Sequence, residues 1–148
     1  MDELSEVRAL FISQKLAVLA TQSNGQPHGC LVAFAGSDDL RYLVFVTERD
    51  TRKYQDIRMN PRVAVLVDSR SNRESDFAET LAVTARGSAA EAEGKELDEC
   101  RRLYLAKHPY LAEFVDRPGT ALIRVRVEEY LAATFRRTWV VRPPQTDC

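Results

Sequence analysis

A hydroxyl, a guanidinium and an ammonium group follow one another in the chain at Thr51, Arg52 and Lys53. They come after the apolar, β-branched run 44–47, which predicts a strand and ends in Thr47. They also open a segment with helical spacing. The first N–H groups of a helix and its positive dipole end attract anions, and arginine and lysine add charge-assisted hydrogen bonds to phosphate oxygens. This stretch is therefore suited to binding a phosphate group.

The same stretch has a second interpretation. Asp50 is an ordinary helix N-cap residue, and many solvated helices begin with a mixed charged turn. Arg52 and Lys53 would then belong to a charged helix surface without a ligand. The stretch alone favours this second interpretation, so the choice depends on the rest of the chain.

The composition limits the classes of protein to consider. The chain has 148 residues, 45% hydrophobic and 29% charged, which is typical of one globular domain, here 1–148. The 21 basic and 22 acidic residues give a net charge of −1, so the overall charge favours neither nucleic acid nor an acidic membrane as partner. No apolar run has the length of a membrane span, and the N-terminus does not resemble a signal peptide. We therefore expect a cytoplasmic protein.

The cysteines and histidines predict neither a disulfide framework nor a metal site. Cys30, Cys100 and Cys148 are odd in number and far apart, without the spacing of a zinc site. His28 could hydrogen-bond a ligand or serve a structural role. His108 precedes a proline at a predicted helix end, where a cation suits the dipole, and a structural role is expected. No Ser–His–Asp arrangement is present, so no catalytic residue is assigned.

Apolar spacing and turn residues predict a mainly β chain with inserted helices, of the α+β class. Asn24-Gly25 favours a tight hairpin, and Asn60-Pro61 ends the helix that starts at Thr51. The continuously apolar run 63–67 predicts a strand that is buried on both faces. The predicted strands are 16–20, 27–35, 40–47, 63–67, 80–90 and 122–127, and the segments 130–135 and 138–141 close the sheet. Six or seven antiparallel strands of this kind can close into a small barrel, which removes exposed edges.

Several short motifs, in this order, resemble the flavin-binding split β-barrel family, whose best known members are the pyridoxamine 5′-phosphate oxidases. The motifs are Leu19-Ala20-Thr21 with Gly25-Gln26-Pro27, then Val44 to Thr47, Thr51-Arg52-Lys53, and Asn60-Pro61-Arg62-Val63-Ala64. The second half, with Tyr104 to Pro109, is similar to a narrower branch that contains bacterial haem-utilisation proteins. The two halves together cover nearly the whole chain.

The resemblance implies a homodimer that binds flavin mononucleotide (FMN) in a cleft between subunits. In that family the phosphate is held by the residues that match Thr51, Arg52 and Lys53, and the hydroxyl that matches Thr47 lies near the flavin. The second strand passes along the ring system and offers backbone groups. The matching residues on that strand include His28, Cys30, Leu31 and Val32. Residues near the partner's C-terminus often complete the pocket, and the candidate here is Trp139, with Arg137 near it. Trp139 could equally pack in the core of its own chain.

The chain departs from the oxidase pattern in two places. The oxidases carry an arginine where this chain has His28 or Gly29, and segment 136–139 lacks a match to the residues that read pyridoxal phosphate. The haem proteins use a C-terminal histidine, which is missing here. The resemblance therefore favours an FMN-dependent oxidoreductase acting on an unidentified small molecule. The alternatives are a haem-binding protein on the same barrel and a flavin-binding protein without turnover.

Overall fold

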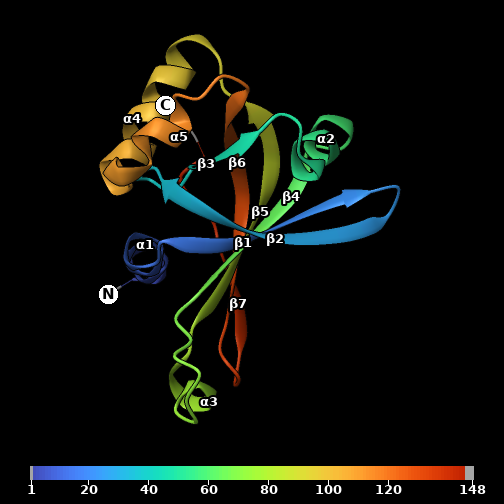
Figure 1. The fold of residues 1–148 in the computed structure, drawn as a ribbon. Coiled ribbons are helices and arrows are strands. Elements are labelled where there is room, and N and C mark those ends of the chain that lie inside the picture. Colours follow the sequence, from blue (N-terminus) through green and yellow to red (C-terminus); the bar gives the residue numbers. More distant parts are fainter. Residues whose placement is uncertain (1, 146–148) are drawn as a thin grey trace.

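The fold is that of a computed structural model, which describes residues 2–145, so that Cys148 lies outside the described residues (Figure 1). The elements in chain order are α1 (Glu3–Ser13), β1 (Leu16–Ser23), β2 (Gln26–Gly36), β3 (Tyr42–Glu48), α2 (Arg52–Met59), β4 (Arg62–Asp68), α3 (Asp76–Glu79), β5 (Ala82–Glu91), α4 (Gly94–Lys107), the 3-10 turn η1 (Pro109–Leu111), α5 (Ala112–Val115), β6 (Thr120–Ala133) and β7 (Thr138–Val141).

The strands form a closed antiparallel barrel with one additional strand. Their order in the sheet is β3-β2-β1-β4-β5-β6-β7, and β3 also pairs with β6. This second pairing closes six strands, while β7 extends β6 outside the closed ring. The predicted antiparallel barrel of six or seven strands is confirmed. The predicted strands 122–127 and 130–135 are, however, one strand of 14 residues, and its long reach lets β6 pair with β3, β5 and β7.

The strand register separates an inner face from an outer face, because residues directly opposite each other lie on the same face. One inner row crosses six strands, and its members are Cys30, Leu19, Val65, Ala85, Tyr130 and Val141. The prediction that run 63–67 is buried on both faces is wrong for the single chain. Val63, Val65 and Val67 are buried, but Ala64 and Leu66 point outward and are half-buried, so the burial alternates as in any one-sided strand.

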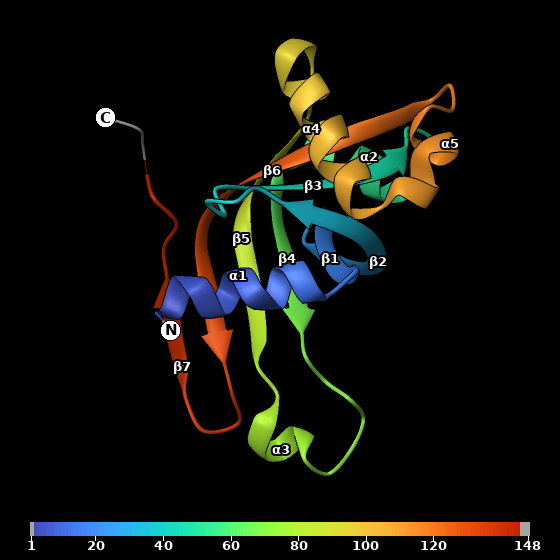
Figure 2. The ribbon, with the colours of Figure 1, turned by 90° about the vertical axis from the view of Figure 1, so that its left-hand side faces the viewer.

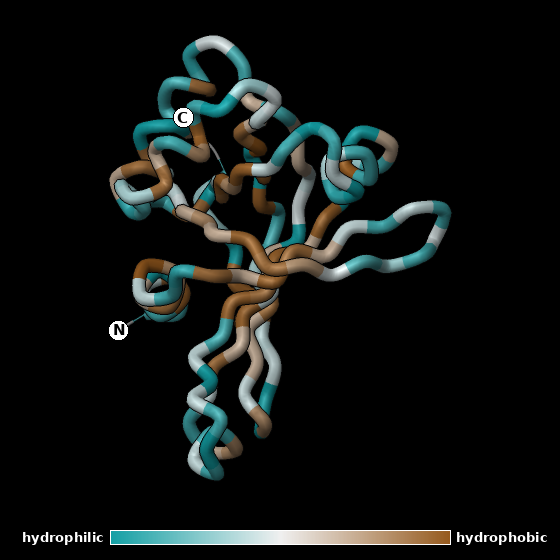
Figure 3. Tube along the Cα trace, viewed as in Figure 1, coloured by the Kyte–Doolittle hydropathy of each residue, from teal (hydrophilic) through white to brown (hydrophobic). Residues whose placement is uncertain are grey.

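Helices cover parts of the barrel and leave other parts open. Helix α1 runs across the strands (Figure 2) and contacts β2 and β4. Its Phe11 ring packs edge-on against Phe34 and Tyr130. Helix α4 packs against β2, β3 and β6, where Tyr104 and Leu122 belong to a second apolar cluster. The tube coloured by hydropathy shows the apolar segments gathered where the strands cross (Figure 3). Within residues 2–145, none of the helices combines the length and apolarity needed to span a bilayer.

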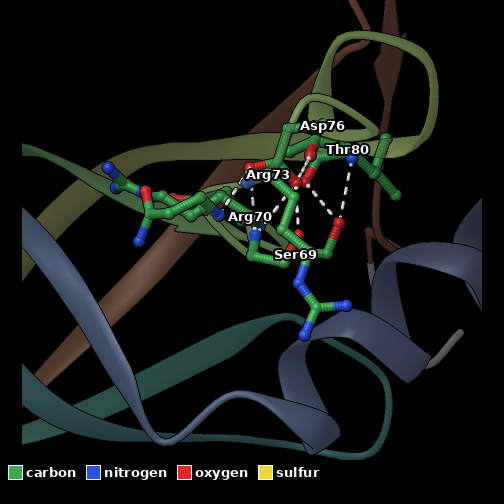
Figure 4. Close-up of polar contacts among 9 residues, drawn as sticks. Ser69, Arg70, Arg73, Asp76 and Thr80 are labelled. Carbon is green, nitrogen blue, oxygen red and sulfur yellow. Dashed lines mark hydrogen bonds and ion pairs between the residues drawn. The ribbon is translucent and has the colours of Figure 1, made fainter.

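The loop between β4 and β5, expected to be exposed and polar, is organised around one carboxylate. Asp76 accepts hydrogen bonds from the backbone N–H groups of Ser71 and Asn72 and from the Thr80 hydroxyl, at 2.7–3.1 Å (Figure 4). These bonds, the Ser71 N–H above all, hold the pKa of Asp76 well below its ordinary value. The loop is therefore built around Asp76 in its ionised form.

Replacing Asp76 by alanine should loosen this loop and leave the barrel intact. We expect amide hydrogen exchange at Ser71 and Asn72 to accelerate by about tenfold or more, because their acceptor is lost. Exchange mass spectrometry or NMR would measure it. The matched control is Glu79→Gln, which changes an exposed side chain of the same loop that has no hydrogen-bond partner among residues 2–145. Equal exchange in both variants would contradict the central role of Asp76.

Candidate functional site

The N-terminus of α2 carries two threonine hydroxyls in contact. Thr51, and not Asp50 as predicted, is the N-cap: its Oγ1 accepts from the Tyr54 N–H at 3.4 Å and donates to the Glu48 carbonyl at 2.8 Å. Asp50 lies one residue too early and is exposed in the turn. The Thr47 hydroxyl lies 2.9 Å from that of Thr51, so the end of β3 and the start of α2 are tied together.

Two cations at this helix start have no acidic partner. Arg52 is exposed and Lys53 is half-buried, and neither side chain forms an ion pair or hydrogen bond with any of residues 2–145. Arg49, three residues earlier, differs: its guanidinium pairs with Glu91 at 2.7 Å. The charges of Arg52 and Lys53 are therefore available to an anion, beside the free N–H groups of the first helical turn.

The charge of Lys53 acts on the second strand. Burial raises the pKa of the Cys30 thiol, and the positive charge of Lys53 opposes this effect. The first turn of α2 and the middle of β2 thus border the same region. Cys30 itself is half-buried, with its Sγ 3.9 Å from the Leu19 carbonyl, and its protonated thiol faces the core side of the strand.

A gap in the barrel opens beside this helix start. Strand β2 pairs with β1 along its length, but with β3 only at Phe34, Ala35 and Gly36. From 26 to 33, the backbone groups of β2 that point away from β1 have no ladder partner among the described residues. Figure 1 shows the β1–β2 hairpin projecting from the barrel, with α2 nearby. A ligand lying in this gap would find free backbone donors and acceptors along β2 and cations at its end.

The predicted flavin residues do not all meet in a single chain. Leu31 points outward and is 68% exposed, whereas Val32 points into the core. His28 is exposed on the hairpin, opposite Thr21. Trp139 lies on β7, at the far end of the molecule from α2 in Figure 1, half-buried against the core with the Arg137 guanidinium 4.0 Å from its ring centroid.

An apolar row crosses the uncovered outer face. Its members, directly paired from β2 to β7, are Leu31, Val18, Leu66, Thr84, Leu131 and Val140. The two ends of the row are exposed, Leu31 at 68% and Val140 at 40%. The row is apolar at every position except Thr84, and exposed apolar rows of this kind are often covered by other proteins.

Sequence reasoning missed a buried polar pair that positions α2. Thr21 Oγ1 donates to Asp56 Oδ2 at 3.0 Å, and both residues are buried, so the bond ties the middle of α2 to β1. Thr21 belongs to the first motif of the family resemblance, which is the signal that could have found it. Asp56 stands in a helix of ordinary charged residues, and its burial comes only from the packing of α2.

His108 is a buried structural residue. Its side chain is fully buried, and its Nε2 lies 2.7 Å from the Phe34 carbonyl, so Nε2 carries the proton and donates. Burial lowers the pKa of His108, with a further lowering from the charges of Lys107 and Lys15, although the Phe34 hydrogen bond opposes it. A buried imidazole with a lowered pKa and a hydrogen bond to Phe34 is consistent with the structural role expected from the sequence, and it does not favour a cation at this helix end.

The protein should lose stability as the pH falls below about 6.5, the ordinary pKa of histidine. In this range His108 is protonated in the unfolded chain but not in the folded chain. The free energy of unfolding therefore falls with decreasing pH, by at most about 1.4 kcal/mol per pH unit. His108→Gln keeps a donor for Phe34 but does not titrate, so its free energy of unfolding should fall less between pH 7.5 and 5.5. His28→Gln is the control. If the free energy of unfolding of His108→Gln depends on pH as steeply as that of the parent protein, this effect is excluded.

Comparison with known proteins places this geometry in a family. The family model described as pyridoxamine 5′-phosphate oxidase matches residues 4–133. The chain belongs to this family. The matched range includes the whole of β2 and, around the start of α2, the residues Thr47, Thr51, Arg52 and Lys53. Among curated protein sequences, none matches the chain.

Solved structures share the fold at low sequence identity. A haem-binding protein from Mycobacterium smegmatis matches with a TM-score of 0.84 at 19% identity, over 96% of this chain and 58% of the other. ChuZ from Campylobacter jejuni matches with a TM-score of 0.77 at 12% identity, over 93% and 58%. A FAD-binding protein from Mesorhizobium loti matches with a TM-score of 0.70 at 21% identity, over 86% and 90%. The chain thus spans little more than half the length of the first two.

Proposed function

We propose that the chain binds FMN as a homodimer and acts as a flavin-dependent oxidoreductase on a small molecule. The observation that carries this proposal is a pair of cations, Arg52 and Lys53, that have no partner among residues 2–145 and lie at the start of α2 beside the gap between β2 and β3. Arg52 supplies a planar fork and Lys53 a point charge, which suits a phosphate monoester. Membership of the oxidase family supports a flavin as the molecule that carries the phosphate.

The residues present fit the remaining parts of the cofactor. The free edge of β2 offers N–H and C=O groups to the polar edge of the flavin ring. The bound flavin supplies the electron chemistry, and the protein contributes position, electrostatics and exclusion of water. Thr47 and Thr51 hold the helix start in place, so that the phosphate meets preorganised donors.

The second subunit is proposed to cover the apolar outer row. Trp139 and Arg137 lie far from α2 of their own chain, so they can reach a flavin only if it belongs to a partner. We expect Leu31→Glu to raise the dimer dissociation constant by about tenfold or more, because a charge would be buried in the interface. Light scattering during gel filtration would measure it. Met59→Glu, at an exposed position on α2, is the control, and equal dimerisation of both variants would contradict the assignment.

A haem-handling function is the second candidate. The structural match to the M. smegmatis haem-binding protein supports it, and His28 supplies an exposed imidazole. Because the other histidine, His108, is buried and bonded to Phe34, His28 is the one histidine able to ligate iron without refolding.

The visible absorption spectrum of the purified protein tests both candidates. A flavin spectrum that stays with the protein through gel filtration after FMN addition is the expected result, and a screen of reductants and acceptors for turnover follows from it. A saturating Soret band with no retained flavin would replace the flavin proposal by haem handling. Retention of neither ligand would overturn both proposals.

A further inference from the structure

A cavity of about 300 Å³ lies between α1, the β2–β3 turn and α4, at the opposite end of β2 from the hairpin that carries His28. Its walls are mainly apolar, with Phe11 from α1, Leu40 from the turn and Leu103 from α4. It opens to solvent beside Ala106 and Ile12, which are both exposed. The volume lies at the lower end of the range of small-molecule sites.

The charged side chains of the cavity leave a positive balance. Lys107 lies half-buried on its wall, where its Nζ donates to the carbonyl oxygens of Phe11 and Gln14, at 2.7 and 2.6 Å, and lies 3.9 Å from the Phe34 ring centroid. No carboxylate of residues 2–145 forms an ion pair with it. The ammonium is thus bound by dipoles and a ring face, without a counter-charge.

Arg8 and Asp38 complete the charged groups of the cavity. The Arg8 Nε donates to the Asp38 backbone carbonyl at 2.7 Å, which leaves the outer guanidinium nitrogens available. The charge of Arg8 contributes to lowering the pKa of Asp2, after the hydrogen bonds from Ser5, but the two side chains form no ion pair. The Asp38 carboxylate is exposed, so solvent screens it more than the half-buried ammonium of Lys107. A net positive charge therefore remains at an apolar cavity.

We propose that this cavity binds a small organic monocarboxylate, with its hydrocarbon part between Phe11, Leu40 and Leu103. Its carboxylate would bind the available guanidinium nitrogens of Arg8 and be attracted by the nearby charge of Lys107. The ligand would supply the missing counter-charge in a region where an unpaired charge is costly. Burial lowers the pKa of Lys107 to about 8, as expected for an ammonium without such a partner. This site is separate from the proposed flavin site, so the result of its test does not depend on whether the chain binds a flavin.

Titration calorimetry with hexanoate, hexanol and hexylamine tests the proposal on the full chain. We expect saturable binding of hexanoate and at least about tenfold weaker binding of the other two, which match its tail but not its charge. Ala106→Phe should fill the mouth of the cavity from an exposed helix position and weaken hexanoate binding by about tenfold or more. Ala9→Phe places the same bulk on exposed α1 outside the cavity lining and should leave binding unchanged.

The charge requirement is tested by Lys107→Met and Asp38→Asn. The first should abolish hexanoate binding and the second should strengthen it, because one removes a cation and the other an anion from the cavity. Lys107→Met also loses two hydrogen bonds to α1, so Ala106→Phe decides the site if that variant fails to fold. Equal binding of hexanol and hexanoate, unchanged binding in Ala106→Phe, or no saturable binding up to about 10 mM would each overturn the proposal.

Discussion

Replacing Arg52 and Lys53 together by alanine is expected to weaken FMN binding at least about 100-fold. Each side chain contributes a charge-assisted hydrogen bond to the phosphate, worth about 1.5–3 kcal/mol when well formed, and exposure of Arg52 reduces this figure by screening. Fluorescence titration with FMN and with riboflavin measures the effect. Because riboflavin lacks the phosphate, its affinity should be the same in the variant and the parent protein.

The matched control is Lys95→Ala with Arg102→Ala. It removes the same two charges from exposed positions on α4, and these side chains also lack an ion pair among residues 2–145. The control excludes a general effect of net charge on anion binding. Unchanged FMN affinity in the Arg52/Lys53 variant, with its thermal unfolding intact, would mean that these residues form only a charged helix surface.

Gly87→Ala is expected to destabilise the barrel by about 3 kcal/mol or more, or to prevent folding. A Cβ atom built on Gly87 would lie 2.0 Å from the Arg126 carbonyl oxygen and 2.9 Å from its carbon, and both are backbone atoms that cannot rotate away. The register between β5 and β6 shifts between Arg86 and Gly87, because Arg86 lies opposite Glu129 and Gly87 opposite Val127. Gly87 thus fixes the path of the strand that closes the barrel.

Chemical denaturation of Gly87→Ala and Gly29→Ala measures this effect. Gly29 is the control because it also lies in a strand, and its added Cβ would have only Val18 Cγ1 within contact, at an ordinary 3.8 Å. We expect a change of less than about 0.5 kcal/mol for Gly29→Ala. Similar losses of stability in the two variants would contradict the steric explanation.

Local chemistry in the sequence determined the hairpin, the end of α2 and the grouping of charged and hydroxyl side chains at its start. Asn24 and Gly25 adopt positive φ angles of 50° and 81°, as the tight turn requires, and Asn60 is the C-cap of α2, just before Pro61. Thr51, Arg52 and Lys53 are adjacent in the chain, so their grouping at the helix start needs no tertiary contact. A glycine within an alternating strand, such as Gly87 in run 80–90, is typical of a bulge, and the β5–β6 register shifts at this residue.

Features that depend on distant segments came only from the tertiary structure. Apolar alternation does not say which strands pair, so the β3–β6 closure and the gap between β2 and β3 could not be read from the chain. The choice of Thr51 over Asp50 as N-cap depends on where the turn after β3 ends. Lys107 resembles any lysine in the last turn of a helix, and only the packing of α4 against α1 places its ammonium on two carbonyl oxygens. Sequence spacing determines what lies within one element, whereas burial and cross-strand register depend on how the elements pack together.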